Sequence, residues 1–293
     1  MPIPAVALVL TAALLHALWN IVLKRSGSNR HLPLITSLML MVVWAPVGLW
    51  VGVDAVPHWG ATEWALMLAS GITHVLYFNV LLRGYRMSDL TVVYPVARGT
   101  GPLISSFGAV LLLGESLSAA GVSGVISVAF GVFLIAGGPG LWRAAHDPAR
   151  RARVHAGLGY GALTGCLIAS YTLVDGYAVK VALISPILVD YVGNLLRIPF
   201  MLPSALRDRP GFVQACRAHW RVGLVVALVA PLAYVLVLYA VQLAPLSHVA
   251  PAREVSMLFA ALLAGSLLGE GDRGLRLLGA AFIAGGVIAL ALG

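Results

Sequence analysis

Charged side chains are scarce in this sequence: Asp, Glu, Lys and Arg make up 10% of its 293 residues, whereas 60% of the residues are hydrophobic. Soluble domains carry about a quarter charged and about half apolar residues, so this composition excludes an ordinary globular protein. A mean hydropathy of +0.94 and 32 glycines are typical of membrane-spanning helices, in which glycine is common. We therefore expect an integral membrane protein.

Cysteines and the short motifs of soluble catalysis are also few. The two cysteines, Cys166 and Cys216, have neither disulfide nor zinc spacing. There is no phosphate-binding loop and no HExxH pattern, which argues against ATP-driven transport by this chain alone. The net charge of +8 comes from basic residues in short loops, which the membrane surface explains better than nucleic acid does. We expect no cofactor, no metal and no nucleic-acid partner.

Apolar runs of about 20 residues recur along the chain, and each is long enough to cross a hydrocarbon core about 30 Å thick. No basic segment precedes the first run, and Lys24 and Arg25 follow it, which indicates a retained helix rather than a cleaved signal peptide. Charges and Pro/Gly clusters divide the runs into predicted spans at 4–23, 33–52, 63–82, 90–113, 117–137, 156–178, 184–202, 220–241, 246–268 and 274–292. The sequence therefore predicts an all-α polytopic membrane protein with ten transmembrane helices.

Lys and Arg are distributed unevenly between the predicted loops. The odd-numbered loops, counted with the first residues of the spans that follow them, carry fifteen of them, and the even-numbered loops carry only Lys180. Cytoplasmic loops are the ones that accumulate Lys and Arg, so the odd-numbered loops should face the cytoplasm. We expect a multi-pass protein of the cell (inner) membrane with both termini on the non-cytoplasmic side.

The second half of the sequence repeats the first. Residues 97–138, aligned without a gap on residues 252–293, share 14 of 42 positions, against about one in ten expected by chance. Five helices are an odd number, so the second unit should be inverted in the membrane, and the loop charges reverse accordingly. We expect a first repeat at 1–138, a basic cytoplasmic linker at 139–155 and a second repeat at 156–293. Inverted repeats are typical of transporters, with the substrate site near the midplane between them.

The five-plus-five layout resembles the drug/metabolite transporter superfamily, specifically its EamA-type members, of which the YddG-type amino-acid exporters are examples. The matching features are Leu-Gly-Glu at the end of helices four and nine (113–115 and 268–270), Pro95 and Pro251 early in those helices, and basic residues after helices one and six. The resemblance covers essentially the whole chain. It implies a ten-helix metabolite transporter, usually an exporter, with a central cavity lined by helices from both repeats.

Away from the ends of the predicted spans, six charged residues fall within them: Arg98, Asp175, Asp190, Arg197, Arg253 and Glu254. Each costs at least about 2.5 kcal/mol at a helix centre, so each should face protein, a partner or water. Arg98 and Arg253 are related by the repeat, and a guanidinium holds a carboxylate bidentately, which favours a carboxylate site. The alternative is that the two arginines hydrogen-bond to unwound backbone beside Pro95 and Pro251. Glu254 should bind an ammonium group or carry a proton, or else pair with Arg98 across the repeat interface.

Aromatic side chains gather at similar depths and are predicted to line the cavity: Trp19, His74, Tyr77, Phe78, Tyr94, Tyr171 and Tyr234. With Arg98, Asp175, Arg253 and Glu254 they form the predicted substrate site. Asp190, Asn194 and Arg197 share one face of helix seven, a stripe more typical of contact between helices than of a ligand site.

Small residues recur at every fourth position in helices five and ten. They are Ala119, Ser123, Ser127 and Gly131 in the first, and Ala281, Gly285 and Ala289 in the second. Such ladders let two helix backbones approach closely. We expect them to form the seam between the repeats.

Other function classes fit less well. His16 to Asn20 and Gly121 to Gly124 superficially resemble two elements of rhomboid intramembrane serine proteases, but no later histidine has the helix context of a general base. Pores are usually lined by rings of like groups, which disfavours a channel. We expect a monomeric carrier of small molecules, not an enzyme. An amino acid is the favoured substrate, and a drug efflux carrier of the same fold is the alternative.

The loop charges generate a topology prediction. A reporter that is active only in the cytoplasm, fused after Gly293, should be silent because both termini are expected outside the cytoplasm. The same reporter fused within the predicted linker at 139–155 should be active. Strong activity of the C-terminal fusion would contradict the topology.

Overall fold

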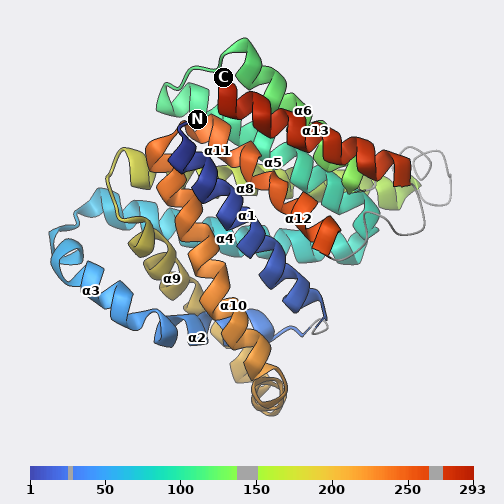
Figure 1. Ribbon diagram of the computed structural model, residues 1–293. Coiled ribbons are helices and arrows are strands. Elements are labelled where there is room, and N and C mark those ends of the chain that lie inside the picture. Colours follow the sequence, from blue (N-terminus) through green and yellow to red (C-terminus); the bar gives the residue numbers. More distant parts are fainter. Residues whose placement is uncertain (26–28, 137–150, 264–272) are drawn as a thin grey trace.

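Figure 1 shows the computed structural model of the protein, which describes residues 1–25, 29–136, 151–263 and 273–293. Every regular element in these ranges is helical. The first half contains α1 (Ile3–Arg25), α2 (Leu32–Val43), α3 (Ala45–Ala55), the short 3-10 helix η1 (Val56–His58), α4 (Ala61–Met87), α5 (Leu90–Leu113) and α6 (Ala119–Ile135). The second half contains α8 (Arg151–Lys180), α9 (Pro186–Arg207), α10 (Arg209–Leu243), α11 (Leu246–Ala252), the 3-10 helix η2 (Arg253–Val255), α12 (Ser256–Leu263) and α13 (Arg273–Leu292).

The lengths and compositions of these helices fit a polytopic membrane protein, as the sequence predicts. Six of the described helices, α1, α4, α5, α8, α10 and α13, are long and apolar enough to cross a membrane. The pair α2–α3 would make a seventh, although it is bent by 67°. Pro46 lies at the start of α3 and has no N–H for the carbonyl one turn back, which explains the bend. The count of ten spans stays a prediction.

Two helices extend further than the sequence pattern indicates. The second-half helix expected at 220–241 begins at Arg209, and α8 begins at Arg151, inside the range 139–155 expected to be a linker. Residues 139–150 of that range lie outside the described part of the chain. The basic residues in these segments mark the edge of the apolar stretch, but Arg is a good helix former, so the helix continues past that edge.

The span expected at 246–268 is interrupted. Its described part divides into α11, the 3-10 turn η2 and α12, whereas residues 264–268 lie outside the described ranges. The break follows Pro251, which lacks the donor for the carbonyl of Ser247. The matching first-half helix, α5, runs unbroken over the predicted range 90–113 although it contains Pro95 and Pro102. Repeat-related segments therefore have different backbones where the candidate site residues lie.

Carbonyls exposed by prolines accept hydrogen bonds from the other half of the chain. The Ser106 hydroxyl on α5 donates to the carbonyl of Ser247 over 2.9 Å. Likewise Pro231 in α10 leaves the carbonyl of Ala227 without its usual partner, and the Trp44 indole N–H donates to it over 2.9 Å. A free carbonyl in a hydrocarbon setting costs several kcal/mol, so these contacts are structural requirements.

Helices of the two halves pack directly on one another. α8 lies between α4 and α5, α10 lies against α1 and α2, and α6 lies along α13. The chain ends are neighbours in Figure 1, and the N-terminal ammonium of Met1 donates to the carbonyl of Ala291 over 2.7 Å. The core of buried side chains is thus shared by both halves rather than divided between them.

Four glycines form the closest backbone contact between the halves, where α6 meets α13. A Cβ on Gly131 would lie 2.5 Å from the carbonyl oxygen of Gly279, and one on Gly124 would lie 2.8 Å from that of Gly286. Both distances are too short for a real Cβ, so only glycine fits. The Ser127 hydroxyl also donates to the carbonyl of Phe282 over 2.8 Å.

The predicted seam therefore joins the predicted helices but uses a different register. Gly131 and Ser127 take part, whereas Ser123 is exposed and donates to the Ala120 carbonyl of its own helix. Gly285 faces open space, with nothing near the position of its missing Cβ. A spacing of four residues marks a face of a helix, but several faces of α6 and α13 carry small residues, so the pattern could not select among them.

The seam predicts opposite effects for two glycines of similar sequence context. Gly131→Ala should destabilise the protein by about 1–3 kcal/mol, because the added methyl overpacks the contact with Gly279. Gly285→Ala should be neutral or stabilising by up to about 1 kcal/mol, because its Cβ meets nothing and Ala is the better helix former. Thermal unfolding in detergent measures both. Equal destabilisation by the two variants would contradict this account of the seam.

Candidate functional site

The centre of the candidate site is an ion pair between the two halves. Arg98 from α5 and Glu254 from η2 approach with Nη2 and Oε2 2.6 Å apart. The side chain of Glu254 is 2% exposed and that of Arg98 is 19% exposed. The pairing across the repeat interface, one of the two interpretations of Glu254 above, is thereby confirmed. Glu254 lies within the 3-10 turn η2, which begins two residues after Pro251.

This ion pair leaves hydrogen-bonding capacity unused. Arg98 Nε is buried without a hydrogen-bond partner in the described part of the chain, and Glu254 Oε2 is close to the guanidinium but not aligned as its acceptor. Buried donors and acceptors normally have partners. The pair can therefore take on a further polar group without first being broken.

The second arginine of the repeat, Arg253, is half-buried at the start of η2. It makes no ion pair with a carboxylate of the described residues. It lies within electrostatic reach of His16, His74 and Asp175. The two repeat-related arginines thus differ: one is paired with an acid, and the other keeps its charge available.

Aromatic side chains from α4, α8 and α10 come together beside these charges. The rings of His74 and Tyr171 stack with centroids 3.9 Å apart, and Tyr234 meets His74 edge-on at 6.3 Å. Tyr77 contacts Tyr171 edge-on at 5.8 Å. The Tyr234 hydroxyl donates to the carboxyl of Asp175, which is fully buried. Five of the predicted site residues therefore form one cluster.

The remaining predicted aromatic residues lie around this cluster. Tyr94 stands one turn before Arg98 on α5 and is within electrostatic reach of it. Trp19 packs edge-on against His16 with centroids 4.9 Å apart, and its indole N–H is buried without a partner among the described residues. Phe78 is half-buried on α4, and none of the described ring contacts includes it. The structure thus places the other predicted aromatic residues in or beside the cluster, whereas Phe78 takes part in none of the described ring contacts.

The polar stripe on α9 is linked mainly within its own helix. The Asn194 amide donates to Asp190 Oδ1 over 3.2 Å, and Arg197 Nη1 lies 3.5 Å from Asn194 Oδ1. Arg197 is also within electrostatic reach of His74 and Asp175. The stripe therefore borders the aromatic cluster, and the hydrogen bonds described for it lie within α9 rather than between helices, which differs from the expectation.

Glu115 makes contacts that the sequence analysis did not predict. It follows Gly114, which ends α5 with a positive φ of 65° that glycine adopts easily. Its carboxylate accepts the amide N–H groups of Leu246 and Ser247 over 2.7 and 2.8 Å, so it caps the start of α11. Lys180 Nζ lies 2.7 Å from the same carboxylate. The Leu-Gly-Glu motif signalled this position, but its partners are distant in sequence.

These partners control the ionisation of Glu115. Burial alone would raise the pKa of its carboxyl, but the hydrogen bonds from Lys180, Ser247 and Leu246 outweigh burial and bring the pKa below the usual value. Glu115 is therefore ionised at neutral pH, as a cap on helix N–H groups requires.

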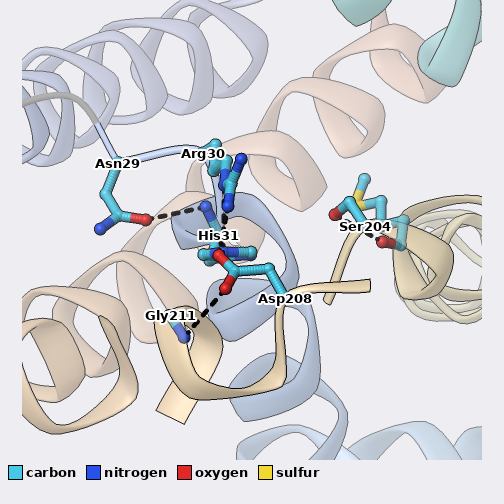
Figure 2. Close-up of polar contacts among 7 residues, drawn as sticks. Asn29, Arg30, His31, Ser204, Asp208 and Gly211 are labelled. Carbon is cyan, nitrogen blue, oxygen red and sulfur yellow. Dashed lines mark hydrogen bonds and ion pairs between the residues drawn. The ribbon is translucent and has the colours of Figure 1, made fainter. Parts of the chain in front are cut away.

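A second polar cluster, shown in Figure 2, joins the segment before α2 to the turn between α9 and α10. The Asp208 carboxylate pairs with Arg30, lies 3.1 Å from His31 Nε2 and accepts the amide N–H of Gly211 over 3.2 Å. These hydrogen bonds hold the pKa of Asp208 below its usual value. A pocket of about 280 Å³ lies next to the cluster and is lined by Asn29, Gly211, Gln214, Ala215, Ala218 and His219. None of the predicted substrate-site residues lines it.

The protease interpretation finds no support in the structure. Ser123 is exposed on α6, and its hydroxyl donates to the carbonyl of Ala120 in the same helix over 2.9 Å. No hydrogen bond of the described residues joins Ser123 to a histidine. A serine nucleophile requires a general base within hydrogen-bond reach.

Comparison with known proteins adds a family to this description. Residues 155–292 match the model of the EamA-like transporter family. A solved structure, described only as a crystal structure of a protein, superposes with a TM-score of 0.75 at 17% sequence identity, over 98% of this chain and 97% of that one. At this identity the likeness shows a shared fold. No curated protein matches the sequence. Over residues 155–292, the second half of this polytopic membrane protein is therefore similar to the EamA-like transporter family.

Proposed function

We propose that the protein is a secondary transporter that exports small metabolites, with amino acids as the favoured class, by alternating access around a central site. The observation that carries this proposal is the match of residues 155–292 to a family of transporters. The site geometry agrees with it, because paired and unpaired charges and aromatic rings from both halves meet inside a bundle of apolar helices. Unlike groups of this kind suit a site that binds, encloses and releases a solute.

The packing of the helices supports an inverted repeat of five plus five spans. With an offset of 155 residues, Gly124 corresponds to Gly279 and Gly131 to Gly286. The two contacts at the seam, Gly131 with Gly279 and Gly124 with Gly286, then become copies of each other with the halves exchanged. The packing of α4 on α8 likewise corresponds to the packing of α10 on α1. Two halves related in this way can rock about a fixed site.

A zwitterion such as an amino acid fits the charges of the site best. Arg253 keeps its charge and offers a bidentate surface to a carboxylate, with the unpartnered Arg98 Nε as a second donor. Glu254 is the acid for the ammonium group, and the rings of Tyr77, Tyr94, Tyr171 and their neighbours form the wall for a side chain. A lipophilic drug cation, the alternative substrate, would bind better beside an acid without arginines.

The direction of transport and the placement in the membrane belong to the same proposal. The loop charges support both termini on the non-cytoplasmic side of the cell (inner) membrane. We propose that one chain suffices for transport, because the site is built from the two halves of a single bundle.

A flux screen tests the function directly. Proteoliposomes loaded with unlabelled L-amino acids should take up labelled amino acids by exchange, whereas labelled sugar phosphates and tetraphenylphosphonium should not exchange. Liposomes without protein provide the baseline. Saturable exchange of the lipophilic cation instead of amino acids would favour the drug carrier, and no exchange of any solute would contradict the proposed function.

The two arginines should respond differently to truncation. Arg253→Ala should weaken substrate binding about ten- to a hundredfold with little change in stability, because Arg253 pairs with no described acid and each lost charge-assisted hydrogen bond is worth about 1.5–3 kcal/mol. Arg98→Ala should instead destabilise the fold by about 3–5 kcal/mol, because Glu254 is then buried without its counter-ion.

Binding titrations and thermal unfolding of the purified variants separate the two effects. Arg221→Ala is the matched control, since Arg221 lies on an exposed face of α10 and stacks on Trp220. It should change neither quantity. Normal substrate affinity in Arg253→Ala would remove that residue from the site.

A further inference from the structure

Asp175 and its neighbour Asp190 differ from the other buried or half-buried acids described, which pair with cations. Glu115 pairs with Lys180, Glu254 pairs with Arg98, and Asp208 pairs with Arg30. Asp175 is 0% exposed, yet no cation of the described residues lies within ion-pairing distance of it. The charge of an ionised Asp175 would therefore be left without direct neutralisation.

The hydrogen bonds of the Asp175 carboxyl are also incomplete. Oδ2 accepts the hydroxyl of Tyr234, whereas Oδ1 is buried and makes no well-aligned hydrogen bond among the described residues, although the Ser70 hydroxyl lies near the carboxyl. Its neighbour on α9, Asp190, has the amide of Asn194 on Oδ1 at 3.2 Å. An unpaired carboxylate charge in an apolar interior is costly, and binding a proton removes that charge, which leaves the smaller cost of a buried O–H group.

Titratable and charged groups face Asp175 from each element around it. They are Ser70 and His74 from α4, Tyr171 from α8 itself, Asp190 and Arg197 from α9, Tyr234 from α10 and Arg253 from η2. His74 Nδ1 is 2.9 Å from the carbonyl of Ser70 and donates to it, so His74 keeps only Nε2 as an acceptor. The two arginines act from a distance in this conformation. Either could neutralise the carboxylate after a change of conformation.

Asp175 lies close to one end of its helix. It is five residues before Lys180, the last residue of α8, which is about 8 Å along the helix axis. Lys180 pairs with Glu115, and Ser118, three residues further along the chain, lies beside Gly293, so this is also the end of the bundle where the chain termini meet. Under the proposed topology this is the non-cytoplasmic side, from which a proton would enter during export.

From this arrangement we propose that Asp175 is the proton-binding site that couples transport to a pH gradient. The inference rests on the proposed function. In the conformation described here the carboxyl carries a proton and Tyr234 donates to its other oxygen. In the opposite conformation Asp175 releases that proton to water, and the carboxylate left behind is neutralised by the approach of Arg197 or Arg253. One proton then moves inward for each solute exported.

The protonation of Asp175 is tested without any substrate. Infrared difference spectroscopy of the purified protein should show the carbonyl stretch of a protonated buried carboxyl at neutral pH. Asp175→Asn should abolish that band, because Asn keeps the size of the side chain and an acceptor for Tyr234 but cannot titrate. Asp190→Asn is the matched control and should retain the band. A band that survives in Asp175→Asn, or no band in the unmodified protein, would overturn the proposal.

The coupling is tested in proteoliposomes with a mixture of labelled L-amino acids as the probe. Asp175→Asn should lose accumulation driven by a pH gradient, and the exchange of labelled for unlabelled amino acids that remains should no longer depend on pH. Asp190→Asn should keep both the accumulation and the pH dependence of exchange. If Asp175→Asn loses exchange as well as accumulation, Asp175 is a substrate contact and the proposal fails. Accumulation driven by a sodium gradient instead would also overturn it.

A second variant guards against misfolding of Asp175→Asn. Tyr234→Phe removes the phenol that donates to the carboxylate, so the infrared band should persist to higher pH, with about tenfold tighter proton binding. An unchanged titration in Tyr234→Phe would place the proton elsewhere. Absence of amino-acid exchange in the unmodified protein would count against the proposed function alone, because the infrared result does not depend on a substrate.

Discussion

A membrane-spanning chain must satisfy its own backbone, because hydrocarbon offers no hydrogen bonds. Here prolines within helices leave two carbonyls without a backbone donor, and side chains from the other half of the sequence donate hydrogen bonds to them. The Ser106 hydroxyl donates to the carbonyl of Ser247, and the Trp44 indole N–H donates to that of Ala227. Glu115 meets the same requirement at a helix start, where it caps the amide N–H groups of α11. The two halves are therefore joined by backbone hydrogen bonding as well as by apolar packing.

The candidate site depends on the same constraint. The interruption of the helix after Pro251 turns one residue pair, Arg253 and Glu254, out of regular α-helical geometry. Glu254 then meets Arg98 across the interface, and Arg253 is left without a paired acid. Neighbouring residues point about 100° apart around an α-helix and about 120° apart in a 3-10 turn, so Arg253 and Glu254 face different surroundings. Only the second repeat has an acid beside its arginine, because Gly99 stands in the first repeat where Glu254 stands in the second. With one acid for two arginines, Arg98 is paired and Arg253 is not.

Much of the site follows from residue types, but its pairings do not. An acid or base within an apolar run is expensive, so the six charged residues stand out in the sequence. Which of them pair depends on the rotation and depth of each helix. The pairing of Arg98 with Glu254 was one of two open interpretations, and residue type alone does not distinguish the surroundings of Asp175 from those of Asp190. For the same reason, the small-residue pattern of α6 included Ser127 and Gly131, which lie at the seam, but also the exposed Ser123, which does not.

By itself the sequence determined the fold class, the approximate position of the described helices and the internal repeat, because hydropathy and local propensity act over neighbouring residues. It placed helix ends less well: α8 and α10 continue through basic segments that the pattern had assigned to loops. Only the tertiary structure decided the glycine register of the seam, the cap formed by Glu115 and the cluster around Asp175. Each of these joins residues far apart in the chain, and contacts between such residues leave no periodic pattern in a single sequence.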